Sequence, residues 1–262
     1  MRIPLYQIDA FSSRLFGGNP AAVCLLDEWL DDATLQAIAA ENNLSETAYI
    51  VSLTSEQFEL RWFTPTVEVQ LCGHATLAGA HVLLRILNSS RTKVRFTTAS
   101  GELTVSRDNE LLSMDFPARK GVATPVLPQV TECLGKRPRE LYQADDYLMA
   151  VYDSEDDIIN LAPDLDRMLG LEDAHAIIVT APGTTSDLVS RFFAPRLGVP
   201  EDPVTGSAHC TLAPYWSERL GKTKLHARQL SRRGGELFCE DKQDRIQLSG
   251  HAVLYSRGEI II

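Results

Sequence analysis

The sequence lacks several features that would decide the class of protein at once. No apolar run approaches the ~20 residues that a membrane-spanning helix requires, and no segment is of low complexity. Basic residues are in the minority, because 25 Lys and Arg stand against 35 Asp and Glu and leave a net charge of −10. Nucleic-acid binders usually carry a basic face, and the one dense basic cluster, RQLSRR (228–233), is typical of a solvated loop. We therefore expect neither a membrane nor a nucleic acid as a partner.

Cysteines are few and irregularly spaced. The chain has five, an odd number, and no two of them form a CxxC motif. This usage favours reduced thiols in a cytoplasmic protein over a disulfide framework. The opening residues MRIPLYQIDAF lack the apolar stretch of a signal peptide and predict a strand instead. We therefore expect a cytoplasmic protein.

The length of the chain leaves room for two domains. A chain of 262 residues can form two domains of ~100–150 residues, each with its own core. The segment ARKGVATPVLP (118–128) contains a glycine and two prolines and is suited to a linker. We therefore predict an N-terminal domain over residues 1–118 and a C-terminal domain over residues 119–262.

Three landmarks of the first half recur in the second half at nearly constant spacing. In each half an aromatic strand pattern precedes a glycine turn and a small-residue helix start, and a strand beginning with GEL follows. The matching segments are RWFTP (61–65) and RFFAP (191–195), CGHATLAGA (72–80) and TGSAHCTLAP (205–214), and GELTV (101–105) and GELFC (235–239). The repetition indicates an internal duplication, and two facing glycine turns would form one site between the halves.

The hydrophobic pattern predicts a mixed α+β protein in which each half is rich in strands and has one principal helix. The predicted helices cover residues 31–43, 75–87 and 207–221, with a short helix opened by Pro163. The predicted strands cover residues 3–10, 21–26, 47–53, 58–63, 93–98, 102–107, 111–116, 174–180, 188–193, 225–230, 235–240, 244–249 and 252–256.

Two glycines at predicted helix starts are candidates for binding an anion. The first N–H groups of a helix have no partner within the helix, and the helix dipole adds partial positive charge there. Gly73 and Gly206 each precede such a helix, and the absence of a side chain would let an anion approach. Either glycine could also simply turn the chain, but their matched positions in the duplication favour anion binding.

Three further residues near the first glycine turn could take part in acid–base chemistry. His74 follows Gly73 directly, and an imidazole can donate or accept a proton near neutral pH. Glu46, at the junction of a helix and a strand in NLSETAYIV, could act as a general base. Cys72 could be a nucleophile or a base at a helix start. The alternatives are a structural histidine, a solvated loop glutamate and a buried apolar thiol.

The segment PEDPVTGSA (200–208) contains more polar groups than a turn requires. Asp202 and Ser207 flank Gly206, and both could donate or accept hydrogen bonds with a ligand. Equally, Asp202 could stabilise a turn before Pro203 and Ser207 could cap a helix.

Several of these segments together are similar to those of a known family. GNPAAV, SET, FTP, CGHAT and EDPVTGSA occur in this order within residues 6–23, 44–50, 61–76 and 192–209. A chance match to all five is improbable. Over most of its length the chain thus resembles the phenazine-biosynthesis PhzF-like family, a branch of the diaminopimelate-epimerase-like fold.

The resemblance implies a fold, a reaction and a set of site residues. The fold would be α+β, with two similar domains related by a pseudo-twofold axis, each a curved barrel-like sheet around a central helix, and an active-site cleft between them. The reaction would be an isomerisation of a small carboxylate-bearing substrate, in which a glutamate moves a proton between carbons without a metal or an organic cofactor. Members are often homodimers. The implied catalytic residues are Glu46, His74 and Asp202, and the implied substrate-binding residues are Asn19, Gly73, Gly206 and Ser207.

One position departs from the epimerase branch of this fold. That branch uses two cysteines, one at each glycine turn. Cys72 stands at the first of these positions, but Pro203 stands at the second. Since proline cannot ionise, racemisation by two thiols is disfavoured, and one carboxylate acting first as base and then as acid is expected.

Other functions are compatible with parts of the pattern. Ser207, His74 and Asp202 supply the residue types of a hydrolase triad, although TGSAH is not the GxSxG motif. His74 and His81, or Asp202 and His209, have spacings that could bind a metal, although no HExxH or CxxC accompanies them. A two-base epimerase, or a binding protein without catalysis, is the remaining alternative.

Overall fold

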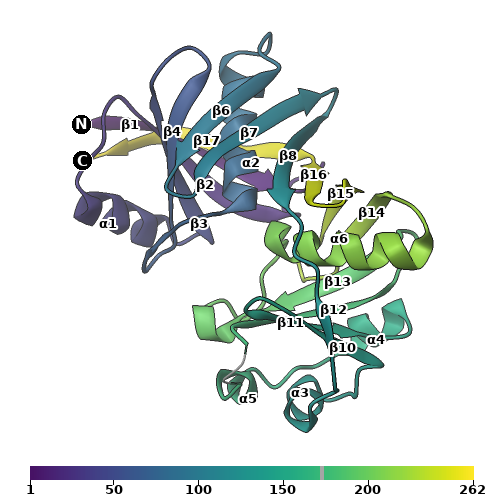
Figure 1. Ribbon diagram of the computed structural model, residues 1–262. Coiled ribbons are helices and arrows are strands. Elements are labelled where there is room, and N and C mark those ends of the chain that lie inside the picture. Colours follow the sequence, from purple (N-terminus) through teal and green to yellow (C-terminus); the bar gives the residue numbers. More distant parts are fainter. Residues whose placement is uncertain (172–173) are drawn as a thin grey trace. The chain divides into compact units, whose positions relative to one another are not determined.

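The computed structural model describes residues 1–171 and 174–262 and divides into two compact units (Figure 1). The first unit contains Met1–Asp115 and also Ser249–Ile262, and the second contains Phe116–Leu248. The predicted C-terminal domain of residues 119–262 is therefore wrong at its end. The physical reason is that the last strand pairs along its length with the first strand of the chain, which returns the C-terminus to the first unit.

The first unit is a sheet of mixed direction. β1 pairs antiparallel with β17 and β2, β2 parallel with β3, β3 antiparallel with β4, β4 parallel with β6, β6 antiparallel with β7, and β7 antiparallel with β8. The strands are β1 (Arg2–Ala10), β2 (Asn19–Leu26), β3 (Glu46–Ser52), β4 (Gln57–Phe63), the short β5 (Glu68–Val69), β6 (Lys93–Thr98), β7 (Gly101–Asp108), β8 (Leu111–Pro117) and β17 (Ala252–Ile261).

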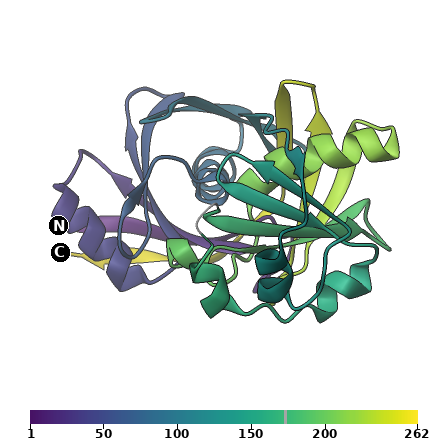
Figure 2. The same cartoon turned by 60° about the horizontal axis from the view of Figure 1, so that its bottom comes forward.

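Helix α2 (Gly73–His81) lies at the centre of the first unit. Figure 2 shows it almost end-on, with strands of this unit curving around it. Its residues His74–Ala80 are all buried, which explains why this segment is made of small and apolar residues. The helix continues into η1 (Val82–Leu87), a π-helical segment. Compared with the helix predicted over 75–87, the observed helix begins two residues earlier and changes to π-helical hydrogen bonding after His81.

Helix α1 (Asp32–Asn42) covers the outside of the first unit, and its two ends follow from the sequence. The carboxylate of Asp31 accepts a hydrogen bond from the backbone N–H of Thr34 at 2.9 Å, which caps the N-terminus. Asn43 ends the helix in the left-handed conformation, with φ of 48°. Leu35, Ile38 and Ala39 face a core shared with β-strand residues such as Tyr49.

The second unit repeats the order of strand pairings found in the first. β10 pairs antiparallel with β11, β11 parallel with β12, β12 antiparallel with β13, β13 parallel with β14, and β14 antiparallel with β15. The strands are β9 (Val122–Thr124), β10 (Glu140–Ala144), β11 (Tyr147–Val151), β12 (Ala176–Pro182), β13 (Leu188–Phe193), β14 (Lys224–Gln229), β15 (Gly235–Asp241) and β16 (Arg245–Gly250). The repeat of RWFTP and RFFAP falls on the ends of β4 and β13, so the duplication inferred from the sequence is a duplication of topology.

The principal helix of the second unit is α6 (Gly206–Leu220), which corresponds in order to α2. It contains Pro214 in its interior and ends at Gly221 in the left-handed conformation, as predicted. The shorter helices are α3 (Pro128–Leu134), α4 (Glu155–Asn160), α5 (Leu165–Leu169) and the 3₁₀ turn η2 (Pro195–Leu197). Val130, Leu134, Ile158 and Met168 from these helices pack into one core with strand residues.

Three details of the second unit differ from the prediction. The predicted linker over 118–128 contains β9, because Val122–Thr124 pairs with β10. Pro163 does not open the short helix, since the carboxylate of Asp164 caps α5 by accepting from the N–H of Arg167. α3, α4, β10 and β11 were not predicted. The α+β fold class is confirmed, and no helix among the described residues is long and apolar enough to cross a membrane.

Candidate active site

The loop before β2 places Asn19 in the interior of the first unit. Gly18 has φ of 65°, and a Cβ atom there would lie 2.1 Å from the carbonyl oxygen of Ala10. Only glycine fits this turn, which explains the glycine in the GNPAAV motif. The next residue, Asn19, pairs with Ala10 across the sheet and is fully buried. A buried amide requires polar partners, and two of these are Ser45, directly before β3, and His74 of α2.

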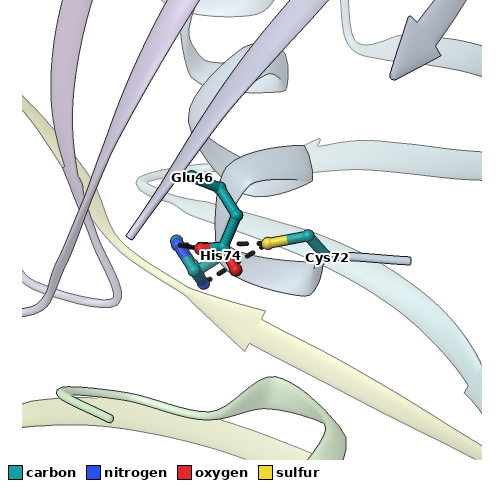
Figure 3. Close-up of side chains that lie close together, drawn as sticks. All are labelled: Glu46, Cys72 and His74. Atoms are coloured by element: carbon teal, nitrogen blue, oxygen red, sulfur yellow. Dashed lines mark hydrogen bonds and ion pairs between the residues drawn. The ribbon is translucent and has the colours of Figure 1, made fainter. Parts of the chain in front are cut away.

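Glu46, Cys72 and His74 form a compact cluster at the N-terminus of α2 (Figure 3). Glu46 is the first residue of β3, and His74 is the second residue of α2. The Nε2 atom of His74 lies 2.8 Å from Oε2 of Glu46. The Sγ atom of Cys72 lies 3.5 Å from Nδ1 and 3.9 Å from Nε2 of the same ring. Two residues predicted to be catalytic are thus neighbours in space.

A hydrogen-bonded chain sets the protonation of His74. The hydroxyl of Ser45 donates to Oδ1 of Asn19 at 3.0 Å, which leaves the Asn19 amide N–H to face Nδ1 of His74 at 3.2 Å. Nδ1 is therefore an acceptor, and a neutral ring carries its proton on Nε2. The chain from Ser45 through Asn19 thus directs the proton of His74 towards Glu46.

The surroundings of His74 influence its pKa in opposite directions. Burial is the largest influence and lowers the pKa, but negative charge on Cys72 and Glu46, with hydrogen bonds to both, raises it, and the net direction is upward. Burial also raises the pKa of Cys72 above its ordinary value, so this residue is an uncharged thiol at neutral pH. An uncharged thiol does not favour a positive charge on the ring of His74. Because the Asn19 amide also opposes a proton on Nδ1, we assign the neutral ring with its proton on Nε2.

The carboxylate of Glu46 is not fully satisfied by its neighbours. Its side chain is 16 % exposed, yet Oε2 is buried and has no well-directed hydrogen bond. The short distance to Nε2 of His74 is therefore a close polar contact with the neutral ring, in which the ring N–H does not point straight at the oxygen. A buried carboxylate oxygen without a directed donor is unfavourable in the resting state. Such an oxygen is available to accept a proton.

The N-terminus of α2 offers a second functional feature in the same place. The helix begins at Gly73, and no side chain caps it. Its first N–H groups therefore lack the usual side-chain acceptor, and the helix dipole favours an anion there. Since His74 belongs to this first turn, an anion bound here would lie next to the carboxylate cluster.

The same cluster contains potential metal ligands. One atom each from Glu46, Cys72 and His74 lie within 4.8 Å of one another, a spacing that could hold a metal ion. The predicted alternative pairings with His81 or His209 are not part of any such group among the described residues. His209 is buried and His81 is partly buried, and desolvation lowers the pKa of each to about 4.

The predicted residues of the second unit gather at the N-terminus of α6. This helix begins at Gly206 and, like α2, has no side-chain cap. The hydroxyl of Thr205 donates to the carboxylate of Asp202, and the hydroxyls of Ser207 and Tyr147 lie 3.4 Å apart. Gln229 accepts from the N–H of Thr205 at 2.9 Å and donates to the carbonyl of Asp202 at 2.8 Å, which fixes the turn.

Sequence reasoning did not single out four of these residues. Ser45 and Thr205 lie inside the recognised SET and EDPVTGSA segments, so their positions were available as a signal. Tyr147 and Gln229 come from β11 and β14 and reach the turn only through the fold. The predicted roles of Asp202, Gly206 and Ser207, and the cleft predicted between the two halves, stay predictions.

The chain is similar to known proteins in both sequence and structure. Residues 8–258 match the family described as phenazine biosynthesis-like protein. The chain belongs to this family. It is 51% identical over 260 residues to a protein named uncharacterized isomerase from Pseudomonas aeruginosa, and the alignment covers 99% of both chains. It is also similar to the crystal structure of a PhzF family protein from Enterococcus faecalis, with 44% identity, a TM-score of 0.97 and complete coverage of both chains.

A more distant structure shows how far the fold extends. The crystal structure of a probable proline racemase from Agrobacterium radiobacter K84 shares 10% identity with this chain at a TM-score of 0.64, covering 99% of this chain and 93% of the racemase. At this identity the likeness concerns the fold alone. The expected diaminopimelate-epimerase-like fold and the PhzF-like family are confirmed.

Proposed function

We propose that this protein is an isomerase that moves a proton within a small carboxylate-bearing substrate, with Glu46 as the acid–base group and no cofactor. The observation that carries the proposal is the buried oxygen of Glu46, which lies 2.8 Å from His74 without a directed hydrogen bond. The names of the relatives, which describe isomerases, support the reaction class.

The proposed substrate site begins at the uncapped N-terminus of α2. The N–H groups at its start bind the substrate carboxylate, because no side chain of the N-cap residue accepts from them and the helix dipole favours an anion. Binding in this way brings the substrate next to Glu46, which contacts the second residue of this helix. An acidic protein can thereby bind an acidic substrate without an arginine in the site.

In the proposed reaction Glu46 transfers a proton twice, first from the substrate to itself and then back to a different carbon of the substrate. Glu46 removes a proton from a carbon that a neighbouring unsaturated group activates: the C–H bond breaks, a carboxyl O–H bond forms, and the electron pair moves into the unsaturated system. The protonated Glu46 then returns the proton to a different carbon. His74, with its proton on Nε2, stabilises the carboxylate before the first transfer and after the second. Acid–base catalysis of this kind contributes ~10²–10⁴-fold to a rate, and positioning supplies the remainder.

A two-base epimerase is the closest alternative because Cys72 also contacts His74. A thiol base would need to ionise readily, and burial raises the pKa of this one. The single carboxylate is therefore favoured over a reaction in which Cys72 is the base.

The test is solvent-proton exchange with the variant Glu46→Gln. Wild-type protein is incubated in deuterated water with a panel of small unsaturated carboxylic acids, and mass spectrometry detects deuterium at carbon. For any acid that exchanges, we expect Glu46→Gln to lose at least 10²-fold of the rate, because the amide keeps the shape but cannot accept the proton. Glu56→Gln, which removes an exposed carboxylate elsewhere in the unit, is the matched control and should behave as wild type.

Two results would contradict the proposal. One is an exchange rate of Glu46→Gln close to that of the wild type. The other is binding of a carboxylic acid, seen by calorimetry, without exchange or isomerisation of any member of the panel, which would favour a binding protein without catalysis.

A further inference from the structure

The cluster of Glu46, Cys72 and His74 combines three types of zinc ligand. It offers a carboxylate oxygen, a thiol sulfur and an imidazole nitrogen, and one such atom from each residue lies within 4.8 Å of the others (Figure 3). Carboxylates alone would suit magnesium or calcium, whereas sulfur and nitrogen ligands select zinc and similar ions. No second group of this kind occurs among the described residues. The chemistry of the ligand atoms therefore points to Zn²⁺.

The distances between these atoms are close to those of a tetrahedral zinc site. Zinc binds sulfur at about 2.3 Å and nitrogen or oxygen at about 2.0–2.2 Å, so tetrahedral ligands lie about 3.4–3.6 Å apart. Here Nε2 of His74 lies 2.8 Å from Oε2 of Glu46 and 3.9 Å from Sγ of Cys72. One distance is shorter than the tetrahedral value and the other is longer, by about 0.3–0.6 Å in each case. Rotations of the Glu46 and Cys72 side chains are needed to reach it, without a change in the backbone.

We propose that Glu46, Cys72 and His74 bind one Zn²⁺ ion through a carboxylate oxygen, Sγ and Nε2, and that the bound ion inhibits the protein. Three protein ligands leave the fourth position of the ion to a water molecule. On binding, the Cys72 thiol becomes a thiolate and its proton leaves to solvent. The inhibition rests on the proposed function, because an ion bound to Glu46 occupies the carboxylate that would accept the substrate proton.

The charges at the start of α2 are compatible with a cation in this place. The helix N-terminus by itself disfavours a cation. The thiolate of Cys72 and the carboxylate of Glu46 together supply two negative charges, which balance the two positive charges of the ion. The side chain of Glu46 is 16 % exposed, whereas Cys72 and His74 are buried. The route past Glu46 is therefore the more open one for the ion, and burial of the other two ligands limits competition from water.

The residues behind His74 can also hold the ring in the form that binds zinc. An ion on Nε2 leaves the ring proton on Nδ1, which then needs an acceptor. Turning over the side-chain amide of Asn19 would present Oδ1 to Nδ1 in place of the amide nitrogen, which lies 3.2 Å from it. The same turn would direct the amide N–H to the hydroxyl of Ser45, which can accept as well as donate. Ser45 and Asn19 thus fit either tautomer of His74.

Titration with Co²⁺ tests the site without any substrate. Co²⁺ is a spectroscopic substitute for zinc, and a cobalt–thiolate bond absorbs strongly in the near ultraviolet. The wild type should show this absorption with one equivalent of Co²⁺ per chain, and Zn²⁺ should abolish it. Cys72→Ser should lack the absorption and raise the zinc dissociation constant, measured by calorimetry, by about 10²-fold or more, since even outer partners of a metal site contribute 10–100-fold. Cys133→Ala, which removes a buried cysteine of the second unit, is the matched control and should bind both ions as the wild type does.

Inhibition is tested by deuterium exchange into an accepted substrate with and without zinc. Stoichiometric Zn²⁺ should lower the exchange rate of the wild type and of Cys133→Ala by about 10²-fold or more, since the ion occupies the acid–base group, and a chelator should restore the rate. The rate of Cys72→Ser should be nearly unchanged by the same zinc.

Three results would each overturn the proposal. They are a wild type without the cobalt–thiolate absorption, a Cys72→Ser protein that binds zinc as tightly as the wild type, and a zinc-loaded wild type that exchanges at its zinc-free rate. A zinc-free protein that exchanges no substrate contradicts the proposed function instead, because the cobalt absorption is measured without substrate.

Discussion

Replacing Asn19 by aspartate should reverse the hydrogen bond between residue 19 and His74, so that Nδ1 of the ring donates instead of accepting. In the wild type the Asn19 amide N–H faces Nδ1 of His74 at 3.2 Å, and the ring proton is therefore on Nε2. The variant Asn19→Asp presents an acceptor of nearly the same shape at this position. Its carboxylate would draw a proton onto Nδ1, and His74 would become a cation held between two carboxylates.

The size of the effect follows from the new positive charge on His74 beside the carboxylate of Glu46. Charge strengthens a polar contact from ~0.5–1.5 kcal/mol to ~1.5–3 kcal/mol. The contact between Glu46 and His74 would therefore be stabilised by about 1–2 kcal/mol more in the variant. Because Glu46 must leave this contact to accept a proton from the substrate, the exchange rate should fall ~5- to 30-fold. The pH–rate profile should also shift to higher pH, where the imidazolium loses its extra proton.

The assay is deuterium exchange into an accepted substrate as a function of pH, with denaturant unfolding to confirm that the variant is folded. Ser45→Ala is the control, because it removes the donor to Asn19 at 3.0 Å and leaves the amide beside His74. It should lower the rate less and leave the pH profile in place. An Asn19→Asp protein with the rate and the pH profile of the wild type would refute the reasoning.

Two further predictions concern single residues. His209 is buried, donates from Nδ1 to the carbonyl of Thr205 at 2.8 Å, and has its pKa lowered to about 4 by burial. Between pH 6.5 and about 4 the unfolded chain binds a proton at this residue that the folded protein excludes. The free energy of unfolding should therefore fall on acidification by on the order of 3 kcal/mol from this residue. Urea unfolding of His209→Asn should show a correspondingly flatter dependence of the free energy of unfolding on pH, and equal pH dependence in the variant and the wild type would contradict this account. For Cys72→Ser, kcat/KM should fall less than tenfold, because the thiol is not the base, whereas a loss above 10²-fold would favour the two-base alternative.

The duplication is the part of the fold that the sequence predicted best. Aromatic residues before a proline mark the ends of β4 and β13, and a glycine marks the start of α2 and α6, because these turns demand particular residue types. The return of β17 to the first unit was not predictable in the same way. Pairing between strands at opposite ends of the chain depends on the closure of the sheet and leaves no local pattern.

The candidate site could be assembled in part from the sequence. Glu46 and His74 were singled out by motif, and the structure brings them within 2.8 Å. The role of Ser45 in directing the Asn19 amide depends on the crossing of three separate segments, which spacing along the chain does not encode. Cys72 was recognised as a helix-start thiol, but the burial that raises its pKa appears only in the packed structure.

The central claim is that one carboxylate, Glu46, both removes and returns the proton. A substrate carrying deuterium at the carbon that loses its hydrogen tests this directly in ordinary water under single-turnover conditions. The account predicts that part of the product carries the original deuterium at its new carbon, since a shielded carboxyl group can hand the same nucleus back before solvent replaces it. Product that never retains the label, formed at an undiminished rate by Glu46→Gln, would contradict it.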